Sequence, residues 1–224
     1  MDIVAWLYPS LERALARWGE LGCEDLLELP LQQQLPPVKP VAGVVVRQAV
    51  VADLDAIIRL YATDPWLYLG DLAPIPGDPA QVRELYLDRL RRGELCLLAM
   101  CGDAIAHVNW SCFSWGDVLP EYPLRLRPGE VYTTDAITAP AFRGKGLHAL
   151  VLGTLLHDAR RRGLHRAYTL ARVGRSATFK GLAQVGYRTC GRLIYFLPKG
   201  KTRAWILSRQ GNLEPLFRSA GAAS

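Results

Sequence analysis

Residues 141–148 read Ala-Phe-Arg-Gly-Lys-Gly-Leu-His, a turn between two segments of different secondary-structure pattern. It joins residues 130–138, whose β-branched and apolar side chains predict a strand, to residues 147–162, whose apolar side chains recur at helical spacing. Gly144 and Gly146 let the backbone turn tightly and bring its N–H groups close to a ligand. The first turn of the helix leaves further N–H donors unpaired at the positive end of the helix dipole. The stretch therefore predicts a turn that suits a phosphate or pyrophosphate group.

The flanking sequence alternates between strand and helix patterns. Strands are expected at residues 44–50, 94–102, 104–113, 130–138, 167–173, 187–197 and 203–208, and helices at residues 53–61, 80–92, 147–162 and 176–185. Gly102 and Asp103 separate two of these strands and form the strongest short hairpin signal in the chain. The order of the segments predicts a mixed sheet with helices packed on it.

The first forty residues differ from the rest. A short helix is expected at residues 10–18, between Pro9 and Gly19. Residues 27–40 then hold four prolines, which stop a helix and predict an extended linker or a strap across a neighbouring element. The chain is accordingly divided into an N-terminal helical extension with a proline-rich linker (residues 1–42), a main domain (residues 43–210) and a C-terminal tail (residues 211–224).

The 224 residues carry a formal net charge of +6 that is unevenly distributed. Residues 1–140 hold 11 basic and 19 acidic side chains, whereas residues 141–203 hold 14 basic side chains and a single acid, Asp158. A chain divided in this way can present a positive surface to a polyanion and a negative surface to another partner. The sequence has no recognisable motif of basic residues interleaved with aromatic ones, so no nucleic-acid partner is expected.

Cysteines, histidines and apolar runs exclude several other classes of protein. The five cysteines form no Cys-x-x-Cys pair and the four histidines form no metal-binding pattern, so we expect reduced thiols and no metal. The longest uncharged apolar runs, such as residues 95–101, fall short of the roughly 18 to 20 residues that a membrane-spanning helix requires. The N-terminus lacks the basic region and long apolar segment of a secretory signal. The cytoplasm is the expected location.

Four segments together resemble the GNAT superfamily of acyl-CoA-dependent N-acyltransferases. Residues 143–147 are similar to the family's Arg/Gln-x-x-Gly-x-Gly/Ala turn, with His148 where the family usually has Gly or Ala. The approach to this turn, Thr-Ala-Pro-Ala-Phe-Arg at residues 138–143, resembles the family's Val-x-Pro-x-Tyr-Arg. Residues 47–57 look like its first strand and helix, and residues 175–187 look like its fourth helix. The resemblance runs in the right order over roughly residues 43 to 200.

The resemblance implies an α/β fold of the α+β type, with a mixed, mostly antiparallel central sheet. This GNAT-like sheet would have six to seven strands, about four helices on its faces and a splay between strands 4 and 5. Acetyl-CoA, or another acyl-CoA, would lie in the splay as cosubstrate, and an amine would attack its thioester directly. The backbone around Ile137 and Thr138 would bind the pantetheine arm and polarise the thioester carbonyl. The residues assigned to the cosubstrate are Ile137, Thr138, Arg143, Gly144, Lys145, Gly146, Leu147, His148, Arg175 and Thr178.

Two departures from the family's pattern concern the fourth helix. Arg175 stands where the family often has Asn, so it would meet the cofactor's phosphates without the same pair of hydrogen bonds. Leu182 stands where many members have the tyrosine that protonates the departing thiolate. A departing thiolate can instead collect its proton from water or from another side chain.

The attacking amine must lose a proton, and Asp135 is the first candidate for its base, with a solvated or arginine-paired structural acid as the alternative. His107 is the second candidate, with a hydrogen-bonded core histidine as the alternative. The expected acceptor is a small-molecule or peptide amine, cationic or neutral, near the irregular segments 66–79 and 113–128. The open alternatives are a catalytically silent acyl-CoA sensor, a longer acyl-CoA or an acyl carrier protein as donor, and a homodimer as the assembled state.

Overall fold

The computed structural model describes residues 3–63, 79–119, 122–201 and 203–217. The helices are α1 (Ile3–Leu15), α2 (Leu54–Tyr61), α4 (Pro79–Arg91), α5 (Leu147–Arg161) and α6 (Ser176–Gln184). The strands are β1 (Gly19–Pro30), β2 (Val44–Gln48), β3 (Leu95–Cys101), β4 (Ala104–Cys112), β5 (Trp115–Leu119), β6 (Tyr122–Arg125), β7 (Glu130–Thr138), β8 (Arg166–Arg172), β9 (Arg188–Pro198) and β10 (Trp205–Gly211). From β2 onward every predicted element is present with ends within a few residues of the prediction. The hairpin of β5 and β6 lies where an irregular segment was expected.

Eight strands form one sheet in the order β10-β9-β1-β8-β7-β4-β3-β2. Its neighbouring strands are antiparallel except β7 and β8, which run parallel. The predicted mixed, mostly antiparallel sheet is therefore confirmed. It has eight strands in place of six or seven because β1, which comes from the segment predicted to lie outside the main domain, is one of its inner strands.

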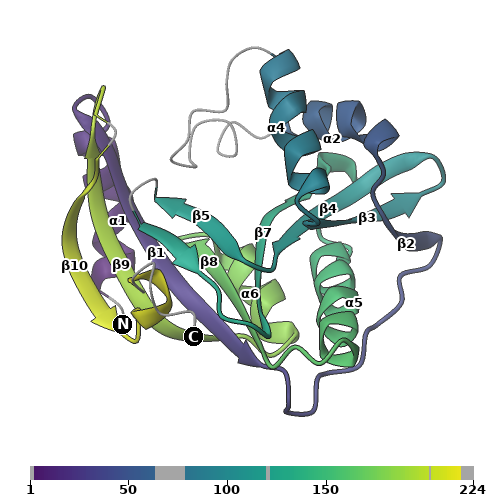
Figure 1. Ribbon diagram of the computed structural model, residues 1–224. Coiled ribbons are helices and arrows are strands. Elements are labelled where there is room, and N and C mark those ends of the chain that lie inside the picture. Colours follow the sequence, from purple (N-terminus) through teal and green to yellow (C-terminus); the bar gives the residue numbers. More distant parts are fainter. Residues whose placement is uncertain (1–2, 64–78, 120–121, 202, 218–224) are drawn as a thin grey trace.

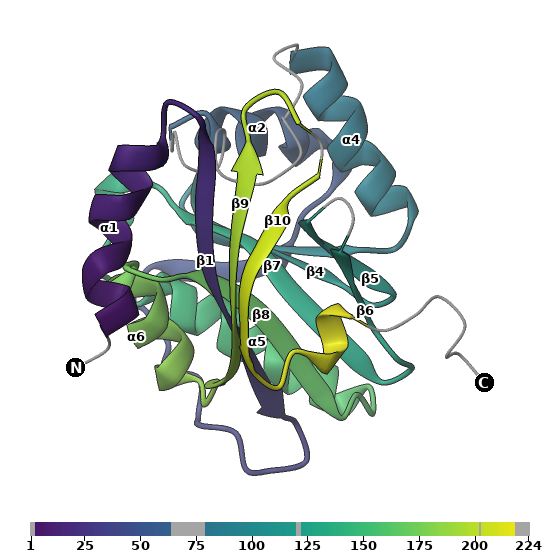
Figure 2. The ribbon, with the colours of Figure 1, turned by 90° about the vertical axis from the view of Figure 1, so that its left-hand side faces the viewer.

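The strand β1 is the largest difference from the sequence analysis. It lies between β8 and β9, antiparallel to both, so residues 19–30 share a sheet with the main domain. The linker predicted from residue 27 therefore begins after Pro30, and the predicted helix at residues 10–18 is α1, which starts earlier and contains Pro9. The acids of β1 meet arginines of β8 and β9 across the sheet. Figure 2 shows α1 alongside β1.

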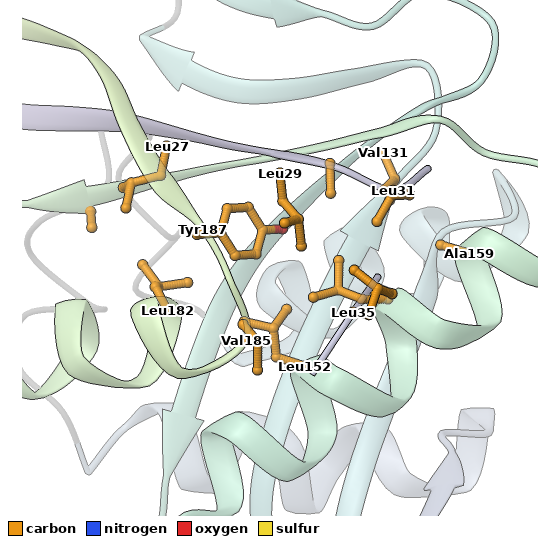
Figure 3. Close-up of a cluster of buried hydrophobic side chains, with 13 residues drawn as sticks. Leu27, Leu29, Leu31, Leu35, Val131, Leu152, Ala159, Leu182, Val185 and Tyr187 are labelled. Carbon is orange, nitrogen blue, oxygen red and sulfur yellow. The ribbon is translucent and has the colours of Figure 1, made fainter. Parts of the chain in front are cut away.

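Leucines of β1, together with Leu31 directly after it, fill the space between the sheet and the helices α5 and α6. Leu27, Leu29 and Leu31 are buried against Leu152 of α5 and Leu182 of α6 (Figure 3). Leu29 and Leu31 are fully buried. Because burial of apolar surface is the main favourable contribution to folding, the N-terminal strand is part of the core that supports α5 and the turn before it.

The helices cover both faces of the sheet, with α5 and α6 on one side and α2 and α4 on the other (Figure 1). Trp110 of β4 is buried in a cluster with residues of α2 and α4. His107 lies three residues earlier in the same strand and faces α5, because side chains alternate between the two faces of a strand. At the other end of the chain, Leu213 and Leu216 pack into the core next to β9, so the first residues of the predicted tail contribute to the same domain.

The parallel pairing of β7 with β8 is short. It joins residues 130–133 of β7 to residues 166–169 of β8, although β7 continues to Thr138 and β8 to Arg172. Beyond Thr133 the two strands have no ladder between them. This is the splay expected between the fourth and fifth strands, and it confirms that part of the predicted fold.

Candidate functional site

The glycine turn leads from the end of β7 into α5. Gly144 and Gly146 have φ angles of 77° and 76°, a region that glycine adopts without the steric cost of a side chain. A Cβ atom built at either glycine would meet no atom within 4 Å. Gly146 is the N-cap of α5, and no side-chain hydrogen bond caps the N–H groups of the first helical turn. The turn therefore has the geometry of an anion-binding helix N-terminus.

Two basic side chains accompany this turn, and both are exposed. The Nε of Arg143 donates to the backbone oxygen of Thr138 over 3.3 Å. The ammonium group of Lys145 lies 5.0 Å from the centre of the Phe142 ring. Arg143, Lys145 and both glycines thus lie together at the surface, whereas Leu147 is buried below them with 2% of its surface exposed.

A β-bulge interrupts β7 opposite Asn109 of β4. Trp110 pairs with Thr134 and Val108 with Ile137, so Asp135 and Ala136 both stand opposite the single residue Asn109. Asp135 has a φ of 49°, and it alone among the described non-glycine residues has a positive φ. Ile137 and Thr138, predicted to bind the pantetheine arm, directly follow this bulge.

The carboxylate of Asp135 forms an ion pair with Arg89 of α4. Arg89 also donates to Glu94 over 2.7 Å, and its guanidinium lies 4.3 Å from the centre of the Trp110 ring. These contacts are the arginine-paired arrangement that the sequence analysis kept as the alternative for Asp135. A base role for this residue stays a prediction, and it would require the carboxylate to accept a proton beside a guanidinium.

His107 is buried, with 1% of its surface exposed. Its Nδ1 lies 2.8 Å from Oγ1 of Thr138, and its ring centre lies 5.5 Å from that of His148. Burial lowers the pKa of His107 well below its usual value, and the neighbouring His148 lowers it further. Burial also lowers the pKa of His148, to about 4. Both imidazoles are therefore neutral at pH 7, and the catalytic role of His107 stays a prediction.

His148 fills a space between α5 and α6. A Cβ atom added at Gly181 of α6 would lie 2.9 Å from Nδ1 of His148, so the large side chain on one helix is matched by a glycine on the other. The structure therefore places this predicted cofactor residue inward, in the contact between the helices, and the exposed part of the turn ends at Gly146.

The first turn of α6 holds the other two residues predicted to bind the cosubstrate. Arg175 is its exposed N-cap, and Thr178 is half-buried one turn along, with its N–H donating to the backbone oxygen of Arg175. Leu182 is buried in the core of Figure 3 and has no proton to donate. The predicted acceptor segment at residues 66–79 lies outside the described residues except for Pro79, which begins α4.

Several polar residues near the bulge were missed by the sequence analysis. Tyr61, Arg89 and Asn109 each contact the backbone or side chains of β7, and the Tyr187 hydroxyl lies 3.2 Å from Oγ1 of Thr133, where the β7–β8 ladder ends. Burial raises the pKa of Tyr187 above its usual value. The sequence places Tyr61 in the predicted helix at residues 53–61 and Asn109 on the same face of its predicted strand as His107, but the contacts of all four residues with β7 are distant along the chain and have no local signal.

Within the described ranges, no three His, Cys, Asp or Glu side chains gather as a set of metal ligands. Among the helices described, none is long and apolar enough to cross a membrane.

No protein-family model matches this chain, and no curated protein matches it in sequence. Solved structures do match its fold. A GNAT-family acetyltransferase from Colwellia psychrerythraea has a TM-score of 0.55 at 16% identity, covering 85% of this chain and 62% of its own. The ribosomal-protein-alanine N-acetyltransferase from Brucella melitensis has a TM-score of 0.54 at 19% identity, covering 72% of this chain and 96% of its own. The protein yncA from Salmonella typhimurium, described as an acetyltransferase and solved with its cofactor acetyl-CoA, has a TM-score of 0.50 at 19% identity, covering 73% and 89%.

These likenesses define the fold of the chain. At identities of 19% and below they show the GNAT fold and no particular activity. The chain spans less than two thirds of the Colwellia protein, at 62% of its length. The fold implied by residues 143–147 and their flanking segments is thus confirmed, and the reaction has to be argued from the site.

Proposed function

We propose that this protein is an N-acyltransferase that transfers an acyl group from an acyl-CoA, most simply acetyl-CoA, to an amine. The observation that carries the proposal is the exposed turn from Arg143 to Gly146, with two glycines at positive φ, at the N-terminus of α5. It lies at the end of β7, the strand that borders the splay. The fold is shared with yncA, which was solved with acetyl-CoA.

The turn fits the pyrophosphate of coenzyme A by shape and by charge. The open space beside Gly144 and Gly146 gives a phosphate group room to approach the backbone. The N–H groups of the first turn of α5 and the side chains of Arg143 and Lys145 supply donors and positive charge. Arg175 and Thr178, at the start of α6, would hold the cosubstrate from the other side of the splay.

The reaction requires a nucleophile, a polarised carbonyl and two proton transfers. The amine nitrogen forms a bond to the acyl carbon, and the bond from that carbon to sulfur breaks and releases a thiolate. Backbone N–H groups of β7 near Ile137 and Thr138 would stabilise the negative charge that develops on the carbonyl oxygen. The amine gives its proton to a base, for which Asp135 and His107 are the predicted candidates, and the thiolate takes one from water or a side chain.

The acceptor is proposed to be a small-molecule or peptide amine that is neutral or cationic. An acyl carrier protein is a further proposed donor, because an acidic partner would be attracted to the exposed basic residues of the turn. A cytoplasmic location is proposed because all five cysteines are free, as is usual in a reducing compartment.

Two observations favour a second candidate, an acyl-CoA-binding protein without catalytic turnover. Leu182 is buried where a proton donor is usual in this family, and Asp135 is paired with Arg89. Such a protein would bind acetyl-CoA through the same turn and would use it as a signal.

The two candidates separate in one experiment. The protein is mixed with acetyl-CoA and a panel of primary amines and peptides, and free thiol is followed over time. We expect thiol release that depends on one class of amine and exceeds the rate without amine. Acetyl-CoA binding without amine-dependent release across the panel would favour the second candidate, and absence of binding would reject both.

A further inference from the structure

The β7 bulge is held in an unfavourable backbone conformation. Asp135 has a φ of 49° in the middle of a strand, a left-handed conformation that is sterically unfavourable for a non-glycine residue. Such a conformation persists only where surrounding contacts impose it, and strain of this kind is concentrated at functional sites. The contacts that impose this conformation therefore indicate the role of the bulge.

Three side chains from three different elements hold the bulge. The Tyr61 hydroxyl of α2 donates to the backbone oxygen of Asp135 over 2.6 Å. Nδ2 of Asn109 in β4 donates to the backbone oxygen of Thr134 over 2.8 Å. Arg89 of α4 binds the Asp135 carboxylate. Tyr61 and Asn109 are buried with 2% and 1% of their surface exposed, so breaking either bond would leave buried polar groups unpaired.

The bulge lies where β7 leaves its partner on the other side. The ladder with β8 ends at Thr133, one residue before the bulge region, and the ladder with β4 resumes at Ile137. Because two residues of β7 stand opposite one residue of β4, the β7 backbone bends locally and its N–H groups change direction. A carbonyl oxygen of a ligand in the splay would thus meet N–H donors whose direction is set by the bulge, and a fixed direction is what makes such donors effective.

Resting on the proposed function, we propose that Tyr61, Arg89 and Asn109 are positioning residues for acyl transfer. They hold the β7 bulge in the geometry that binds the acyl thioester, and Asp135 is the anchor of the bulge. Arg89 lies between the carboxylates of Asp135 and Glu94 and against the Trp110 ring. The guanidinium that binds Asp135 is therefore itself held in place by Glu94 and Trp110. In this assignment the Asp135 carboxylate anchors the bulge through Arg89 and does not transfer a proton.

Two substitutions at one position separate the two roles of Asp135. Asp135→Gly and Asp135→Ala both remove the carboxylate, but glycine adopts a positive φ readily and alanine does not. If the backbone geometry matters, Asp135→Gly is expected to retain at least fivefold more kcat than Asp135→Ala, with an unchanged pH-rate profile. Equal loss in both variants, together with a changed pH-rate profile, would show that Asp135 is a base and would overturn the proposal.

Tyr61→Phe tests the clamp with the removal of a single oxygen atom. We expect kcat to fall about tenfold, since one buried hydrogen bond is lost, while the dissociation constant of acetyl-CoA, measured by calorimetry, changes less than threefold. Tyr8→Phe is the matched control, because the Tyr8 hydroxyl also donates to a strand carbonyl, that of Leu21 in β1, at 2.9 Å. The control is expected to keep full kcat.

The outcomes are distinct. A kcat of Tyr61→Phe within twofold of the unmodified protein would overturn the positioning role while leaving the acyltransferase proposal intact. Equal losses of kcat in Tyr61→Phe and Tyr8→Phe would also overturn it, because the effect would then follow general stability. If the unmodified protein binds acetyl-CoA and turns over no amine, the proposed function fails and this inference fails with it.

Discussion

The place of β1 in the sheet can be tested by truncating Leu29. This side chain is fully buried and packs in the cluster with Leu152, Val185 and Tyr187 (Figure 3). Replacing a fully buried leucine by alanine removes its apolar contacts and leaves a cavity, which costs about 2–5 kcal/mol. For a domain of this size each kcal/mol lowers the melting temperature by about 2–4 °C, so a central cost of about 3 kcal/mol corresponds to a fall of about 6–12 °C.

The assay is urea unfolding of Leu29→Ala followed by far-UV circular dichroism, with a thermal scan beside it. Leu11→Ala on α1 is the matched control, because Leu11 is 49% exposed and its loss is expected to change stability by less than about 0.5 kcal/mol. A second probe of the same strand is Gly22→Ala, whose Cβ would lie 1.8 Å from Cζ of Tyr195. If Leu29→Ala unfolded at the same urea concentration as Leu11→Ala, β1 would not lie between β8 and β9.

Two further predictions concern the turn and the buried histidines. Gly146→Ala is expected to weaken acetyl-CoA binding about tenfold in calorimetry, whereas Gly163→Ala, with a similar φ of 83° and equally open space at the other end of α5, should cost similar stability without affecting binding. Equal affinities in the two variants would contradict the phosphate turn. Because burial lowers the pKa of His107 and of His148, the latter to about 4, the unfolded chain binds protons that the folded chain does not. The free energy of unfolding should therefore fall as pH drops from about 6.5 to about 4, and less steeply in His148→Gln; an identical pH dependence of urea midpoints in the two proteins would contradict this.

The sequence predicted the turn and its flanking elements because their signals are local. A strand run, two glycines and a helical repeat follow one another within residues 130–162. The strand β1 was missed because Glu24 and Asp25 interrupt its apolar residues, and its partners β8 and β9 come more than a hundred residues later. The place of His148 was also hidden, because its side chain packs beside Gly181 of the next helix, a contact that no local pattern in the sequence shows.

The position of β1 also changes the meaning of the uneven charge distribution. The acids of β1 pair with arginines of the basic segment through Glu20 and Glu24 with Arg172, Asp25 with Arg192, and Glu28 with Arg166. Part of the charge separation along the chain is thus an internal match between one strand and its two neighbours. Exposed basic residues such as Lys145 remain to attract an anionic cosubstrate, so the expected attraction between the basic segment and a polyanion is unaffected. The acids of β1 already have cationic partners, so a preference for a cationic acceptor must come from acids elsewhere in the chain.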